Sequence, residues 1–113
     1  MSKKKRKDIQ VKVDIDFTEY IGGIIDAPLE EFSTTIERDR VPVGVLLNTK
    51  ALLVMMYGDL CDRKDAIMKM YKQGALEQEE VTDIFKKIYA ELTKIEAKVL
   101  YLEERINKLL DVG

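Results

Sequence analysis

Residues 77–111 read EQEEVTDIFKKIYAELTKIEAKVLYLEERINKLLD, and the spacing of their apolar side chains decides the fold. Positions a and d of a heptad repeat are apolar over about four heptads, without a polar interruption. A repeat of this length is typical of helices that pack in a coiled coil or a bundle. We therefore predict one long helix over residues 77–111 and name its a and d residues the seam. The seam consists of Val81, Phe85, Ile88, Leu92, Ile95, Val99, Leu102, Ile106 and Leu109.

Apolar residues beside the seam favour a bundle over an isolated two-stranded coil. Because they widen the apolar surface, the helix is expected to contact more than one neighbour. These flanking residues are Ile84, Tyr89, Leu100, Tyr101 and Leu110.

Residues 49–73 predict a second long helix. Asn48 and Thr49 both have side chains that suit the N-cap, and Gly74 suits the left-handed position just after the last turn. The first half of this helix is apolar nearly all round, which indicates that it is covered on several sides.

The two long helices predict an antiparallel αα-hairpin with its bend at Gly74. Pairing about that bend brings Leu53 opposite Val99. The last helix is longer than its mate, so residues 102–110 extend beyond the hairpin. They need cover from residues 41–47, from the short helix that precedes them, or from another subunit.

A short β-strand is predicted over residues 9–17. Apolar and polar residues alternate there, which is the period of a strand with one buried face. A strand needs a hydrogen-bonding partner. This one is expected to pair with residues 41–45 or with the same strand of a second copy across a two-fold axis. Its apolar face consists of Ile9, Val11, Val13, Ile15 and Phe17.

Residues 27–38 predict a short helix between the strand and the hairpin. Asp26 suits its N-cap and Pro28 its first turn. Phe32 and Ile36 share one apolar face. The fold class that follows is mainly α: a long antiparallel hairpin of coiled-coil or bundle type, with a short N-terminal strand and a short helix, in an oligomer.

Charge divides the chain into a basic arm, residues 1–8, and one helical domain, residues 9–113. Residues 3–7 carry five positive charges, so the net charge of −2 leaves −7 on the rest of the chain. The arm is open to three interpretations: a solvated flexible tail, a sequence-independent contact with nucleic-acid phosphates, or a nuclear import signal. Its basic residues are Lys3, Lys4, Lys5, Arg6 and Lys7.

The sequence offers little for catalysis. It has no histidine and contains neither a G-x-S-x-G elbow nor a phosphate-binding glycine-rich loop. The single cysteine, Cys61, has no histidine to activate it. We expect no enzymatic activity, no metal and no cofactor.

Localisation follows from the same composition. One cysteine allows no internal disulfide and suits a reducing compartment. The basic start is not followed by an apolar signal-peptide region. The most apolar run, residues 41–57, is short and interrupted by polar residues. We expect a cytoplasmic protein that does not associate with a membrane.

These observations predict a non-enzymatic, oligomeric helical interaction protein: an adaptor, a scaffold or an assembly component. Its partner would be a second copy or another protein, met through the seam and through Val11, Val13 and Ile15 of the strand. The alternative is a small nucleic-acid-associated regulator whose basic N-terminal arm, Lys3 to Lys7, contacts phosphates.

Overall fold

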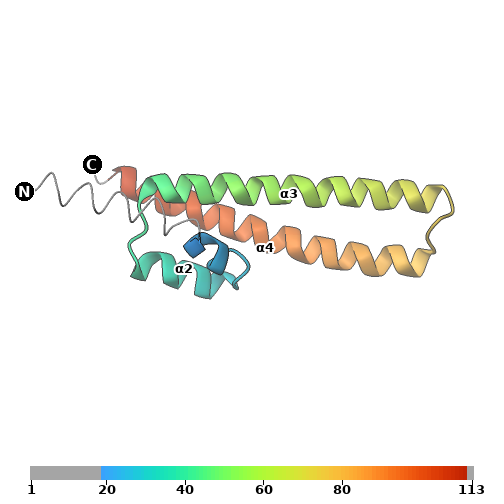
Figure 1. Cartoon of the computed structure of the whole chain (residues 1–113), viewed down its shortest axis with the longest axis horizontal. Helices are drawn as coiled ribbons and strands as arrows, with labels where there is room; N and C mark the ends of the chain where they lie inside the picture. The colour runs from blue at the N-terminus through green and yellow to red at the C-terminus, as the bar shows by residue number, and fades with distance from the viewer. Residues whose placement is uncertain (1–18, 112–113) are drawn as a thin grey trace, which may run out of the picture.

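The computed structural model describes residues 19–111, which form a mainly α-helical fold. The helices are α2 (Leu29–Arg38), α3 (Val43–Lys72) and α4 (Gln78–Asp111), preceded by a helical stretch at residues 19–24. Helices α3 and α4 lie side by side along their whole length, which confirms the predicted hairpin (Figure 1). No strand occurs among residues 19–111.

Two predicted elements lie outside the described residues: the strand at residues 9–17, with Val11, Val13 and Ile15, and the basic arm at residues 1–8. The strand partner suggested at residues 41–45 is described, and that suggestion is wrong. Val41 precedes α3, and residues 43–45 form its first turn.

Helix α3 begins six residues earlier than predicted. Pro42 stands at its N-cap with φ −65° and ψ 154°, and no side chain caps the end. Proline suits a helix start because the first backbone N–H groups have no partner within the helix. Thr49 lies inside the helix, where its hydroxyl donates to the Val45 carbonyl at 2.7 Å. The early start is favoured by burial of Leu46, which is fully enclosed.

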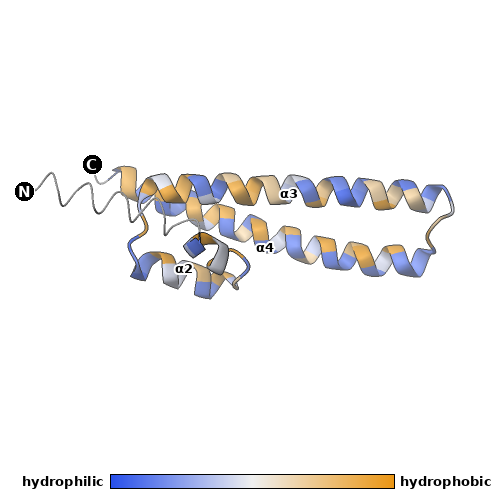
Figure 2. Cartoon of the chain, viewed as in Figure 1, coloured by the Kyte–Doolittle hydropathy of each residue, from blue (hydrophilic) through white to orange (hydrophobic). Residues whose placement is uncertain are grey.

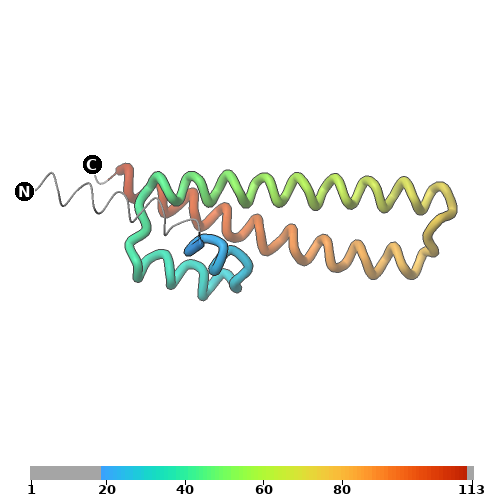
Figure 3. The backbone as a smooth tube through the Cα atoms, in the orientation of Figure 1, coloured from blue at the N-terminus to red at the C-terminus, as the bar shows by residue number. Residues whose placement is uncertain are grey.

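The bend follows the prediction. Gly74 has φ +81°, its N–H donates to the Tyr71 carbonyl, and the Ala75 N–H donates to the Met70 carbonyl. This pair of hydrogen bonds is the Schellman arrangement, which requires a left-handed residue just after the helix. The tube in Figure 3 shows α4 starting directly after this bend.

The register of the hairpin agrees with the predicted pairing to within one residue. The Tyr57 hydroxyl donates to Glu96 Oε1 at 2.9 Å, and Lys50 Nζ lies 3.6 Å from Glu103 Oε2. Both pairs fit an alignment in which Leu53 lies near Val99. Leu53 is fully buried and Val99 packs against the core.

Helix α2 and residues 19–25 cover the end of the hairpin opposite the bend (Figure 1). Phe32 packs edge-to-face on Tyr101 with 6.2 Å between ring centroids, and the Tyr101 hydroxyl donates to the Ser33 carbonyl at 3.2 Å. The final turns of α4 are therefore covered by the same chain. The core here consists of Ile21, Ile25, Phe32, Ile36, Val41, Leu46, Leu53, Ile95, Leu102 and Ile106.

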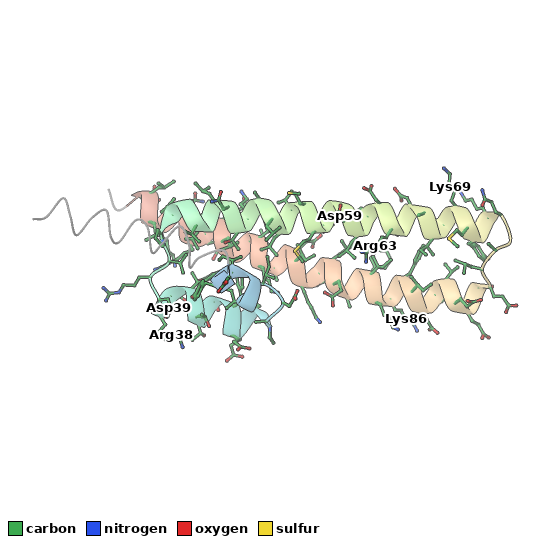
Figure 4. All side chains as sticks on the ribbon, viewed as in Figure 1. Arg38, Asp39, Asp59, Arg63, Lys69 and Lys86 are labelled. Atoms are coloured by element: carbon green, nitrogen blue, oxygen red, sulfur yellow. The ribbon has the colours of Figure 1, made fainter. Side chains whose placement is uncertain are left out.

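The predicted start of the short helix was also wrong by two residues. Helix α2 begins at Leu29, Pro28 stands at the N-cap, and no side chain makes a capping hydrogen bond. Asp26 therefore does not cap it. Its other end is fixed by Asp39, which accepts hydrogen bonds from the Tyr20 hydroxyl at 2.6 Å and from Arg38 Nε at 3.0 Å. Figure 4 shows Arg38 and Asp39 together at this end.

Candidate interaction surface

The seam lies inside the chain's own hairpin. Six of its residues are buried and the other three are partly buried, facing α3 and the core around α2. The predicted packing of the seam is thus met within one chain, and its contact with a second chain stays a prediction. The buried members are Val81, Ile88, Leu92, Ile95, Leu102 and Ile106; the partly buried ones are Phe85, Val99 and Leu109.

The first half of α3 differs from its prediction. It was expected to be covered on several sides, but only Leu46, Thr49 and Leu53 of this helix are buried. Val54 is 53% exposed and Met55 is 66% exposed. Val54 lies about 100° and Met55 about 200° round the helix from Leu53, so α4 covers neither side chain fully. The described chain therefore leaves an apolar surface open to solvent.

This open surface carries a heptad spacing of its own. Leu47, Ala51, Val54 and Gly58 follow one another at intervals of four, three and four residues. We name these four residues the outer stripe. A Cβ added at Gly58 would meet nothing within 4 Å, so the stripe is unobstructed there. The sequence predictions do not include this stripe, because the first half of α3 is apolar nearly all round and no single face stands out there.

The outer stripe adjoins a groove between α3 and α4. Val54, Tyr57, Glu96, Val99 and Leu100 line this groove, whose volume is 340 Å³. Leu100 is 62% exposed at its edge. The hydrogen bond from the Tyr57 hydroxyl to Glu96 raises the pKa of that tyrosine and gives the groove one polar wall. The remaining lining is apolar, as expected of a surface that packs against another molecule.

The apolar surface ends near the middle of α3. Beyond Gly58 the helix carries Asp59, Asp62, Arg63 and Lys69 on exposed positions. Figure 2 shows hydrophobic residues gathered in the half of α3 nearer to α2, and Figure 4 places Lys69 close to the bend. Residues 47–58 span about 17 Å at 1.5 Å per residue.

A buried lysine joins α4 to residues 19–25. Lys98 is 4% exposed, its Nζ donates to the Ile25 carbonyl at 2.5 Å and it lies 5.5 Å from the centre of the Phe32 ring. Burial lowers the pKa of Lys98, while Asp26 and Glu91 act in the opposite direction. No role for Lys98 follows from the heptad pattern, in which it lies beside the seam. In the structure, Lys98 is buried and makes a contact within the core.

Residues 19–111 contain no group of three or more histidine, cysteine, aspartate or glutamate side chains that could hold a metal ion. Cys61 is a free, partly buried thiol. By length and composition alone, α3 is long and apolar enough to cross a membrane, and 17% of its most apolar window is buried. The helix therefore does not have the high burial of a core helix that passes the same test.

Comparisons with protein-family models, with curated proteins and with solved structures found no match to this chain. Its function has to be inferred from its own surface and charge. The candidate interaction surface is the outer stripe with the groove beside it, because both are apolar and exposed on a hairpin that has its own core.

Proposed function

We propose that the chain is a non-enzymatic helical interaction protein, an adaptor, scaffold or assembly component that associates with itself. The observation that carries this proposal is the exposed apolar half of α3. Contiguous apolar patches on a folded surface mark sites of association, because removing them from water is favourable. The hairpin already has a core, so the patch is available to a partner.

A protein partner suits this surface better than a bilayer. The outer stripe runs for about 17 Å, roughly half of the 30 Å hydrocarbon core of a membrane, and exposed charged residues follow it from Asp59 onward. The Lys50–Glu103 ion pair joins α3 to α4 along the same stretch. Insertion of α3 would therefore bring charged groups into lipid, at a cost of several kcal/mol. A cytoplasmic location remains part of the proposal.

Light scattering after size-exclusion chromatography, at several protein concentrations, tests this function. The chain has a mass of 13.0 kDa, and we expect a mass of at least twice that value. A mass of 13.0 kDa at every concentration up to the high micromolar range would reject self-association.

A second candidate function is supported by the charge of the N-terminal arm. Lys3 to Lys7 give five positive charges in succession, as in arms that neutralise phosphates. In this alternative the helical domain brings two or more arms to one nucleic acid. The −7 charge of the rest of the chain makes it the weaker candidate.

A further inference from the structure

We propose that the outer stripe is the contact between two copies of this chain, paired antiparallel across a two-fold axis, with Leu47 opposite Gly58 and Ala51 opposite Val54. The proposal rests on the proposed self-association and names the surface that performs it. It uses exposed residues of α3 and leaves the seam inside each hairpin.

The spacing of the stripe specifies this geometry. Residues at intervals of four and three lie along one side of a helix and form the a and d positions of a heptad. Reversing one copy brings each a residue opposite a d residue. A two-fold axis repeats each contact, since residue i of one copy meets residue j of the other and j meets i. The axis then lies between Ala51 and Val54.

Complementary side-chain sizes select the alignment. Leu47 faces Gly58 and Val54 faces Ala51, so each large side chain meets a small one on both sides of the axis. Close packing needs such alternation, because two large residues clash and two small ones leave a void. A parallel pair would set Gly58 against Gly58 and leave a cavity there.

Shifted antiparallel alignments fit less well. Moving one copy by a heptad in one direction sets Leu47 opposite Asp65, a charged residue. Moving it in the other direction sets Gly58 opposite Arg40, which precedes the first residue of α3. The favoured alignment brings no like charges together, because Lys50 lies level with Met55 and Asp62 lies level with Val43 along the axis.

Helix α4 enlarges the contact. Val54 belongs both to the outer stripe and to the groove, where Leu100 and Tyr57 lie beside it. A partner helix on the stripe therefore also covers Leu100, and the two hairpins form a four-helix arrangement at this end. Four-helix packing of this kind is a common way to bury wide apolar faces.

Disulfide trapping tests the alignment directly. In a Cys61→Ser background, Ala51→Cys and Val54→Cys are made in separate chains, one of them carrying a size tag. Mixed under mild oxidation, the two chains should form the mixed disulfide in several-fold excess over either same-site disulfide. A Lys69→Cys chain, whose cysteine lies near the bend, serves as the control and should give no dimer-specific product.

Val54→Glu gives a second test. Val54 is half exposed, so the variant should keep its helical circular dichroism while the dimer dissociation constant rises by at least about tenfold. Met70→Glu is the matched control: Met70 is 41% exposed on the same helix but outside the stripe, and its dimer should persist.

The outcomes separate this inference from the proposed function. A chain that stays monomeric overturns both. If trapping gives mainly same-site disulfides, or if the dimer survives Val54→Glu, the proposed interface is wrong. Self-association would still stand in that case. A monomeric wild type that floats with phosphatidylcholine vesicles, and loses this on Val54→Glu, overturns both by assigning the surface to lipid.

Discussion

Arg40 has φ +50°, a left-handed backbone conformation that glycine adopts at lower cost. It stands just after α2, where the Arg40 N–H donates to the Glu37 carbonyl and the Val41 N–H donates to the Ile36 carbonyl. This is the Schellman arrangement that Gly74 makes after α3. The buried side chains of Val41 and Ile36 hold the chain in this path despite the strain.

Arg40→Gly is therefore predicted to stabilise the protein. Relief of the left-handed strain should raise the free energy of unfolding by about 1 kcal/mol, less the entropy that glycine adds to the unfolded chain. Urea denaturation measures the change. Gly74→Val is the reverse change and should lower the free energy of unfolding by more than ~1 kcal/mol. Because nothing lies within 4 Å of the added Cβ, this loss would come from the positive φ alone. A destabilised Arg40→Gly would show that the arginine side chain matters more than its backbone.

Lys98 predicts a pH dependence of stability. Its pKa in the folded chain lies below the ordinary value of 10.5 because the ammonium is buried. Between the lowered pKa and 10.5 the unfolded chain binds more protons than the folded one, so stability due to Lys98 rises with pH in that window. Below both pKa values this contribution is constant.

The check compares wild type with Lys98→Met by urea denaturation between about pH 8 and pH 10.5. We expect the difference in unfolding free energy to move in favour of the wild type as pH rises. The comparison cancels the tyrosines, whose pKa values are raised in the folded state and which act in the opposite direction. A difference that does not change with pH would mean that Lys98 is hydrated.

At the scale of elements, the sequence predicted the hairpin well because periodicity and turn chemistry agree there. The seam of α4, the register with α3 and the left-handed Gly74 all follow from local patterns. The start of α3 does not follow from a local pattern. Val41, Val43 and Val45 alternate with Pro42 and Gly44, which is the pattern of a strand. Only the packing of Val41 and Leu46 against α4, which local sequence does not encode, makes this stretch the start of a helix.

The sequence predicts the candidate interaction surface only in part. The outer stripe of α3 is visible in the sequence as a second heptad, yet sequence alone cannot say which side of an apolar helix its partner covers. The seam of α4 has the stronger pattern, so the sequence predicts the interface there; the structure shows the seam packed within the hairpin, and its contact with a second chain stays a prediction. The role of Lys98 depends on residues far away in the chain and had no local signal.

Core positions beneath α2 and in the middle of the hairpin should differ in their sensitivity to mutation. Leu102 is fully buried where α2, α3 and α4 meet, so Leu102→Ala should cost about 2–5 kcal/mol of unfolding free energy. Leu60 is partly buried. Because its surroundings can relax more easily, Leu60→Ala should cost less. Urea denaturation of both variants, with exposed Leu110→Ala as the control, checks this order. Equal losses would mean that the two positions are packed alike.

At the scale of the whole molecule, charge and apolar surface occupy different parts of the chain. The five positive charges of residues 3–7 precede the described helices, whereas the outer stripe lies on α3. An acidic remainder of −7 would repel nucleic acid, so any contact with phosphates depends on the arm. Association and nucleic-acid binding can therefore be separated by changing one part at a time.

Deletion of residues 2–7 is predicted to leave the oligomeric mass unchanged, because the outer stripe is untouched. We also expect little change in binding to a DNA duplex or a single-stranded RNA, measured by fluorescence anisotropy between about 50 and 200 mM salt. A variant with all five basic residues changed to glutamine keeps the length of the arm and controls for it. If the arm were the functional site, each lost phosphate contact would reduce the slope of log affinity against log salt by about 0.9. A steep slope in the wild type that both variants abolish would therefore establish the nucleic-acid regulator in place of the scaffold, whatever the oligomeric mass.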